Sequence, residues 1–140
     1  MKVTLSKTCA HPQVVKIILR NTPTLDPLAI LLNSDLYILE EGSTIVAFST
    51  LKKMGTAYEL GTVYTHEDHR GRGYASLLIR RILEREDSIH VLCRESLSGF
   101  YTRLGFRERK DVHSMVQLRK YLFNLLLRPI CGYSVCSLGT

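Results

Sequence analysis

The chain has 140 residues, of which 45% are hydrophobic and 23% are charged, a composition ordinary for a globular protein. This length suits one domain and is too short for two, and no apolar run approaches the ~18 residues of a membrane-spanning helix. Because the N-terminus also lacks the apolar block of a signal peptide, we expect a cytoplasmic protein with no membrane partner.

The net charge of +6 is concentrated in the second half of the chain. Residues 1–65 hold 6 Lys/Arg and 5 Asp/Glu, whereas residues 66–140 hold 13 and 8. A basic half suits a polyanionic partner such as a phosphate-bearing cofactor or nucleic acid. Aromatic residues are not interleaved with the basic ones as a base-stacking surface requires, so nucleic acid is the less favoured partner.

Short strands and helices fill the first 65 residues. Strands are predicted over Lys2–Ser6, Leu36–Glu40, Thr44–Leu51 and Ala57–Thr65. Helices are predicted from Pro12, where Val14, Val15, Ile18 and Leu19 mark a short helix, and over Leu25–Leu32. Gly42 lies in a hairpin turn, and Gly61 inside the last of these strands indicates a bulge or a close backbone approach.

A loop rich in arginine and glycine follows that strand and leads into a helix. Gly71 and Gly73 remove side chains where the backbone comes close to another group, and the helix start leaves unpaired N–H groups. With Arg70, Arg72 and the positive end of the helix dipole, these donors predict a site for an anion such as a pyrophosphate. Ser76 excludes a dinucleotide-binding fingerprint, and no Gly-Lys-Ser/Thr sequence follows as in a P-loop. A basic nucleic-acid tract or a solvated turn without a ligand are the alternatives.

The helix after this loop has the clearest periodicity in the chain. Its apolar stripe consists of Ala75, Leu78, Ile79, Ile82 and Leu83. The nearly continuous apolar run Ile89–Cys93 then predicts a strand covered on both faces. A strand–helix–strand crossover of this length implies that Ala57–Thr65 and Ile89–Cys93 are parallel.

Two more helices and two more strands are predicted after residue 94. An apolar helical stripe of Leu97, Phe100, Tyr101 and Leu104 ends at Gly105. Strands are predicted over Phe106–Arg109 and Gly132–Leu138, and the helix between them, Leu118–Leu127, is stopped by Pro129. Seven of the ten residues of that helix are apolar, so a homodimer face is the alternative to core packing.

The cysteines and histidines do not show a metal-ligand spacing. Cys93 is predicted to be a small core residue, and Cys131 and Cys136 are close enough in sequence to approach one another, although reduced thiols are favoured. His66, Glu67, Asp68 and His69 are adjacent acids and histidines in a turn, which are usually solvated. We therefore expect no bound metal.

Two motifs resemble those of the GNAT superfamily of N-acetyltransferases. Arg70-x-x-Gly73-x-Ala75 matches its Arg/Gln-x-x-Gly-x-Gly/Ala signature, and Gly99–Phe106 resembles its Tyr-x-x-x-Gly-Phe segment. The resemblance covers roughly residues 35–108. It implies a single N-acetyltransferase domain over residues 1–140 with an α+β, three-layer fold. Its mixed, mostly antiparallel central sheet would contain a parallel β-α-β crossover and carry helices on both faces.

The resemblance also implies acetyl-coenzyme A as the cosubstrate. Thr62, Val63 and Tyr64 correspond to the strand end whose backbone pairs with the pantetheine arm. The pyrophosphate cradle corresponds to Arg70, Gly71, Arg72, Gly73, Tyr74 and Ala75. One position departs from the family pattern, because Arg94 stands where relatives often place an asparagine that binds the cofactor arm.

Two residues are the catalytic candidates. Glu59, the one carboxylate inside its strand, matches the family's general base, shares a strand face with Gly61 and Val63, and is expected to have a raised pKa in a half-buried cleft. Tyr101 matches the tyrosine that protonates the coenzyme A thiolate in many relatives. The alternatives are a solvated charge at Glu59 and a core tyrosine at Tyr101.

The resemblance and these residues together favour an acetyl-coenzyme A-dependent N-acetyltransferase. Direct attack of a primary amine in a ternary complex is implied, with a small-molecule or protein amine as acceptor. A basic surface disfavours cationic polyamine acceptors. A non-catalytic acyl-coenzyme A-binding module and a basic nucleic-acid-binding domain are the alternatives.

Overall fold

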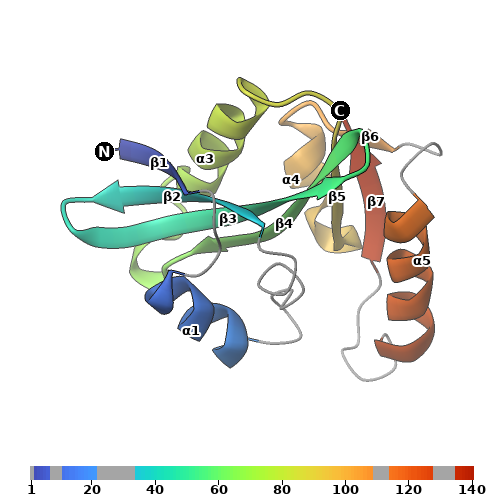
Figure 1. Cartoon of the computed structure of the whole chain (residues 1–140), viewed down its shortest axis with the longest axis horizontal. Helices are drawn as coiled ribbons and strands as arrows, with labels where there is room; N and C mark the ends of the chain where they lie inside the picture. Colours follow the sequence, from blue (N-terminus) through green and yellow to red (C-terminus); the bar gives the residue numbers. More distant parts are fainter. Residues whose placement is uncertain (1, 7–10, 22–33, 109–113, 128–134) are drawn as a thin grey trace. The chain divides into compact units, whose positions relative to one another are not determined.

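The computed structural model describes residues 2–6, 11–21, 34–108, 114–127 and 135–140 (Figure 1). Two compact units make up the chain. Unit 1 comprises Met1–Lys52 and Leu60–Glu86, and unit 2 comprises Lys53–Glu59 and Asp87–Thr140. Strands β3 (Thr44–Met54) and β4 (Ala57–Thr65) each run from one unit into the other.

Antiparallel strands form the framework of unit 1. β1 (Lys2–Ser6) pairs with β2 (Asp35–Glu41), and β2 pairs with β3, so that Ile38 lies between Thr4 and Phe48. The predicted strands are confirmed, and β3 extends beyond its predicted end to Met54. The chain reverses there at Gly55, whose φ of 65° favours glycine.

Two helices cover opposite faces of the β2–β3 hairpin (Figure 1). α1 (Pro12–Arg20) buries Val14 and Ile18 in a cluster with Leu36, Ile38, Ile45 and Phe48. α3 (Tyr74–Leu83) buries Leu78, Ile79 and Ile82, which confirms its predicted stripe. The helix predicted from Pro12 is confirmed, and Leu19 within it is 61% exposed. The helix predicted over Leu25–Leu32 lies outside the described residues.

The order of the strands in unit 2 differs from their order along the chain. β7 (Val135–Gly139) lies between β5 (Ile89–Arg94) and β6 (Arg107–Glu108) and is antiparallel to both. Among the described residues the sheet has seven strands, in the order β1-β2-β3-β4-β5-β7-β6. It is mixed and mostly antiparallel with one parallel pair, as predicted.

A short helix carries Tyr101. A 3₁₀ turn, η2 (Glu95–Leu97), leads into α4 (Ser98–Thr102), and the chain then reverses at Gly105, whose φ is 100°. The predicted apolar stripe is only partly buried. Tyr101 is 5% exposed, whereas Leu97 is 45% exposed because it precedes the helix in η2.

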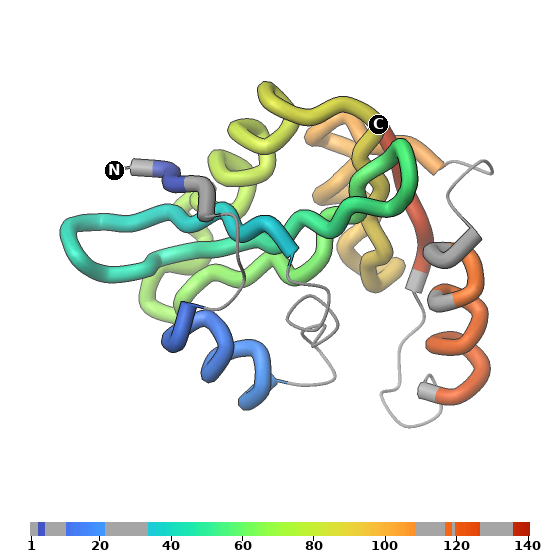
Figure 2. The backbone as a smooth tube through the Cα atoms, viewed as in Figure 1, coloured from blue at the N-terminus to red at the C-terminus, as the bar shows by residue number. Residues whose placement is uncertain are grey.

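The last helix lies beside β7 (Figure 2). α5 (Ser114–Leu122) continues as a π-helical turn, η3 (Phe123–Leu127). The helix predicted over 118–127 is confirmed, and it begins four residues earlier; Pro129 lies outside the described residues. Its exposed large side chains are Leu118, Tyr121, Leu122, Leu125 and Leu126. Core packing is therefore the wrong interpretation for these five. Within the described chain, no helix has the length and apolarity to cross a membrane.

Candidate functional site

Strand β4 contains the bulge that Gly61 indicated in the sequence. Gly61 lies against Thr50 of β3, and Tyr64 stacks on Phe48 with ring centroids 5.2 Å apart. Between these two contacts β3 advances by two residues and β4 by three, so β4 carries one additional residue. The Thr62 amide donates to the Thr50 hydroxyl at 3.0 Å.

The bulge changes which side chains of β4 share a face. Tyr64 lies on the face of Phe48 and of Gly61, so Val63 lies on the opposite face. The prediction that Val63 shares a face with Glu59 and Gly61 is therefore wrong, because strict alternation fails across an inserted residue.

Two polar side chains of β3 occupy the space above Gly61. A Cβ at this position would overlap the Thr50 hydroxyl oxygen and lie 3.3 Å from Lys52 Nζ. Lys52 itself is 1% exposed. The Thr62 hydroxyl is also buried, and it has no hydrogen-bond partner among the described residues. The sequence analysis did not predict that Thr50 and Lys52 lie against Gly61. Because the two residues alternate along β3, the sequence could have placed them on one face of the sheet.

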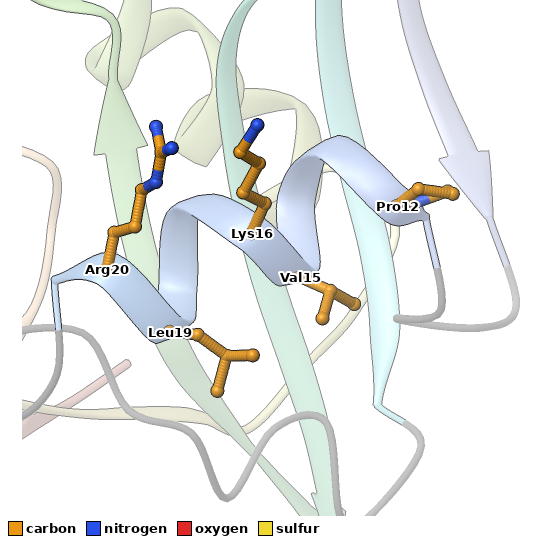
Figure 3. Close-up of a pocket in the computed structure, with 5 residues that line it drawn as sticks. All are labelled: Pro12, Val15, Lys16, Leu19 and Arg20. Carbon is orange, nitrogen blue, oxygen red and sulfur yellow. The ribbon is translucent and has the colours of Figure 1, made fainter.

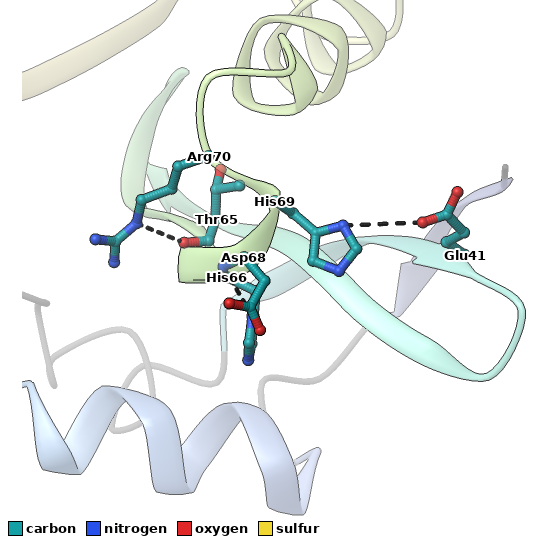
Figure 4. A network of polar contacts seen from close by, with 6 residues as sticks. All are labelled: Glu41, Thr65, His66, Asp68, His69 and Arg70. Carbon is teal, nitrogen blue, oxygen red and sulfur yellow. Dashed lines mark hydrogen bonds and ion pairs between the residues drawn. The ribbon is translucent and has the colours of Figure 1, made fainter.

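A capped turn connects β4 to the loop. The His66 amide donates to Val46 at 2.9 Å, and His66 Nδ1 accepts from the Asp68 amide at the start of a 3₁₀ turn, η1 (Glu67–His69). Arg70 Nε donates to the Thr65 carbonyl at 3.2 Å (Figure 4). This bond anchors the Arg70 side chain at Nε, and its terminal nitrogens point away from the other residues drawn (Figure 4).

The loop glycines are required by backbone conformation. Gly71 and Gly73 have φ values of 76° and 80°, and a Cβ on either would meet nothing within 4 Å. The space beside this backbone is therefore open to another molecule. Arg70, Gly71, Arg72 and Gly73 are all exposed, and Tyr74 and Ala75 are half-buried.

The N-terminus of α3 is an anion-binding arrangement. Gly73 caps the helix without a side-chain hydrogen bond, and the first turn contains no acidic residue. The first intrahelical bond runs from the Leu77 amide to the Gly73 carbonyl at 3.0 Å, so the preceding amides have no intrahelical partner. Free N–H groups, the helix dipole and the two neighbouring arginines all favour a negatively charged group.

The histidines of the loop make local contacts. His69 Nδ1 lies 3.8 Å from Glu41 Oε2, and its ring lies 6.0 Å from that of Tyr74. His66 Nδ1 is 3.6 Å from Asp68 Oδ2. In the described residues, three or more His, Cys, Asp or Glu side chains are nowhere grouped so that they could hold a metal ion.

The two catalytic candidates belong to unit 2. Glu59 is 2% exposed, so its interpretation as a solvated charge is wrong. The start of its strand is held by a bond from the Tyr58 amide to the Ser88 carbonyl at 3.0 Å. Tyr101 packs edge-on against Phe100 and Phe106, with centroid distances of 5.1 and 5.6 Å. Burial, and secondarily the nearby Cys93, raise the pKa of the Tyr101 hydroxyl, which therefore stays protonated.

An open hollow of about 580 Å³ lies along the outer face of α1 (Figure 3). It is lined by Pro12, Val15, Lys16, Leu19 and Arg20. The lining contains none of the candidate site residues.

The sequence was compared with known protein families, and one family matches. Residues 33–108 match the family described as "Acetyltransferase (GNAT) domain", which is more than half of the 140 residues. The chain belongs to the GNAT acetyltransferase family. The resemblance to this family that the sequence motifs indicated is thereby confirmed. A comparison with curated proteins gave no match.

Solved structures with the same fold include other acetyltransferases. N-acetylglutamate synthase from Neisseria gonorrhoeae, complexed with coenzyme A and N-acetyl-glutamate, is 13% identical with a TM-score of 0.71; the match covers 99% of this chain and 35% of that one. This chain thus spans about a third of that protein's length. A GNAT family acetyltransferase from Elizabethkingia anophelis with acetyl-CoA bound is 16% identical, with a TM-score of 0.61 and coverage of 77% and 78%.

A third structure matches over nearly the whole of both chains. An acyl-CoA N-acyltransferase from Pseudomonas aeruginosa is 13% identical with a TM-score of 0.63, and the match covers 99% of this chain and 97% of that one. At these identities the similarity shows a shared fold.

Proposed function

We propose that this GNAT family member transfers an acetyl group from acetyl-coenzyme A to a primary amine by direct attack in a ternary complex. The N-terminus of α3 carries the proposal, because its free amides, two glycines with positive φ and two arginines suit a pyrophosphate. Solved structures of the same fold contain coenzyme A or acetyl-CoA, which supports the same ligand here.

The proposed cofactor site consists of two consecutive segments. Thr62, Val63 and Tyr64 would offer backbone groups at the end of β4 to the pantetheine arm. The pyrophosphate would lie against the loop and the first turn of α3, at Arg70, Gly71, Arg72, Gly73, Tyr74 and Ala75.

The proposed chemistry needs a base and a hydrogen-bond donor. Acetyl-coenzyme A supplies a thioester carbonyl, and amine attack there breaks the carbon–sulfur bond and releases a thiolate. Glu59, directly or through a water, accepts the proton that the attacking nitrogen loses. Tyr101 donates a hydrogen bond to the departing sulfur, since its hydroxyl stays protonated. The raised pKa of Tyr101 favours stabilisation of the thiolate over complete proton transfer to it.

The proposal covers residues 1–140 as one N-acetyltransferase domain, because β3 and β4 both continue from one unit into the other. The acceptor is a primary amine of a small molecule or a protein. A cytoplasmic location stays a prediction.

Binding of the cofactor is tested at the loop with matched glycine variants. Gly73→Val and Gly42→Val both place a side chain at positive φ, 80° and 64°, in open space. Both should therefore lose about 1–2 kcal/mol of stability from backbone strain. Calorimetric titration with acetyl-coenzyme A should show at least tenfold weaker binding for Gly73→Val and unchanged binding for Gly42→Val. Equal affinity in the two variants would show that the cradle is elsewhere.

Turnover separates an enzyme from a binding module. Release of free thiol from acetyl-coenzyme A is followed across a panel of amines. Glu59→Gln keeps the shape of the side chain and removes the base, so it should lower turnover by about a hundredfold or more and leave cofactor affinity unchanged. Cofactor binding without thiol release for any amine would support the acyl-coenzyme A-binding module instead.

A further inference from the structure

Two cysteines of unit 2 are direct cross-strand neighbours. Cys93 of β5 pairs with Cys136 of β7 in the antiparallel register, and their Sγ atoms are 3.7 Å apart. Both thiols are free. The sequence suggested Cys131 as the neighbour of Cys136, but strand order brings Cys136 to Cys93 from 43 positions away along the chain. Cys131 lies outside the described residues.

The register places the two Cα atoms at a separation that a disulfide spans. The Thr140 amide donates to the Ile89 carbonyl at 2.9 Å, so these residues form a hydrogen-bonded antiparallel pair. Such pairs recur at every second position, which makes Cys93–Cys136 a hydrogen-bonded pair as well. Its Cα separation is then about 5.5 Å, within the usual range for a disulfide.

The two thiols differ in their exposure to solvent. Cys93 is 6% exposed, whereas Cys136 is half-buried. Burial, together with the charge and the hydrogen bond of Cys136, raises the pKa of Cys93 to about 12. Cys93 therefore keeps its proton and can donate a hydrogen bond to the Cys136 sulfur, which is the more accessible of the two.

We propose that Cys93 and Cys136 form a reversible redox site, oxidised to a cross-strand disulfide by a peroxide and reopened by a dithiol. The Cys136 thiolate attacks one oxygen of hydrogen peroxide, the O–O bond breaks, and a sulfenic acid and hydroxide form. Cys93 sulfur then attacks Cys136 sulfur, the S–O bond breaks, and the leaving hydroxide takes up the Cys93 proton. Two thiols and one peroxide thus give one disulfide and two waters.

This site lies next to the proposed catalytic tyrosine. Ser137, beside Cys136 on β7, contacts Lys120 of α5 at 3.5 Å, so by alternation Cys136 faces the opposite side of the sheet. α4, which carries Tyr101, contacts β7, and Cys93 is a secondary cause of the raised pKa of the Tyr101 hydroxyl. Closing the bond shortens the Sγ separation by roughly 1.7 Å. A shift of this size beside Tyr101 should lower turnover by roughly ten- to a hundredfold, an effect that rests on the proposed function.

The full-length protein is treated with hydrogen peroxide, alkylated, reduced with dithiothreitol and alkylated again with a second reagent. Peptide mass spectrometry should find that neither Cys93 nor Cys136 carries the first alkylating reagent. The two should instead occur in one cross-linked peptide that is two hydrogens lighter than the separate peptides, and reduction should release both thiols for the second reagent. Oxidation should raise the melting temperature by roughly 5–10 °C, because the bond closes a long loop. The matched control Cys136→Ser should show neither change, and Cys93→Ala should show no cross-link either.

Two results would overturn the proposal. One is over-oxidation of Cys136 to a sulfinic acid while Cys93 stays a free thiol. The other is a cross-link from Cys136 to Cys9 or Cys131. These results do not depend on catalysis, so an inactive protein would still report on the disulfide. A cross-link with unchanged turnover would overturn only the effect on Tyr101.

Discussion

Gly61 is the residue whose identity the structure constrains most directly. The Thr50 hydroxyl fills the place of its Cβ, and Lys52 Nζ closes the remaining space. The constraint comes from β3, because both polar side chains project from that strand over the bulge. A Cβ here would push against the hydroxyl that accepts the Thr62 amide hydrogen bond.

Gly61→Ala should therefore lower the free energy of unfolding by about 1–3 kcal/mol, through overpacking. Gly99→Ala is the matched control, because a Cβ there would meet only Arg103 Nη1, at an ordinary 3.7 Å. That control lies in α4 and should be neutral or stabilising by about 0.5–1 kcal/mol. Urea denaturation measures both values. Equal stability of the two variants would contradict the contact with Thr50.

Tyr101 is predicted to act through its hydroxyl group. Tyr101→Phe keeps the ring packing against Phe100 and Phe106. Stability should change by at most about 1–2 kcal/mol, and turnover should fall by roughly ten- to a thousandfold. Tyr121→Phe, on an exposed tyrosine, should change neither quantity. Full activity in Tyr101→Phe would leave Tyr101 as a core residue alone.

The pH dependence of turnover gives a second test of Tyr101. Because burial raises its pKa, the hydroxyl is protonated at every pH below that raised value. Wild-type turnover should then show no loss from Tyr101 ionisation up to about pH 10, the reference pKa of tyrosine. Steady-state rates between pH 7 and 10 check this. A loss near pH 9 that disappears in Tyr101→Phe would contradict the raised pKa.

The helix formed by α5 and η3 exposes the apolar side that an amphipathic helix normally buries. An apolar stripe normally faces the core, yet Leu118, Leu122 and Leu125 face solvent. Lys120, on the other side, contacts Ser137 of β7. Periodicity predicted this helix correctly but could not tell which face packs against the sheet. The homodimer face, which the sequence offered as the alternative to core packing, stays a prediction.

The double variant Leu125→Lys, Leu126→Lys should leave the free energy of unfolding within about 0.5 kcal/mol of the parent, because both side chains are more than half exposed. Its solubility should rise, since an apolar patch is removed and charge is added. Leu78→Lys, at a fully buried position of α3, should unfold the protein. Thermal melting and light scattering over a range of concentrations measure stability and self-association together. A loss above about 1.5 kcal/mol in the double variant would mean that the stripe is covered.

Local patterns predicted the elements well and their arrangement less well. The ends of β1, β4 and the glycine loop follow from alternation and turn residues, which act over a few positions. Gly61 indicated either a bulge or a close backbone approach, and the sequence could not tell whether a residue is inserted, so the face reversal at Val63 was not predicted. The Cys93–Cys136 pair was missed for a similar reason, since it follows from β7 entering between β5 and β6.

At the scale of the whole molecule, the raised pKa values of Cys93 and Tyr101 make the free energy of unfolding depend on pH in alkaline solution. Burial raises the pKa of Cys93 to about 12 and that of Tyr101 above its usual range. The folded protein thus holds protons that the unfolded chain releases above about pH 9. Stability should be constant from pH 7 to 8.5 and should fall as the pH rises further. Tyr101→Phe should flatten the fall between pH 10 and 11, as measured by urea denaturation; an unchanged slope would contradict the linkage.

The place of β7 in the sheet has a consequence for biosynthesis. It is the last of the described strands along the chain, yet it pairs on both sides, with β5 and with β6, and β6 is the edge strand that ends the described sheet. On the ribosome, β6 therefore emerges before the strand with which it must pair. The polypeptide has to keep these edges apart from other nascent chains until translation reaches Val135, because unpaired edges readily recruit foreign strands.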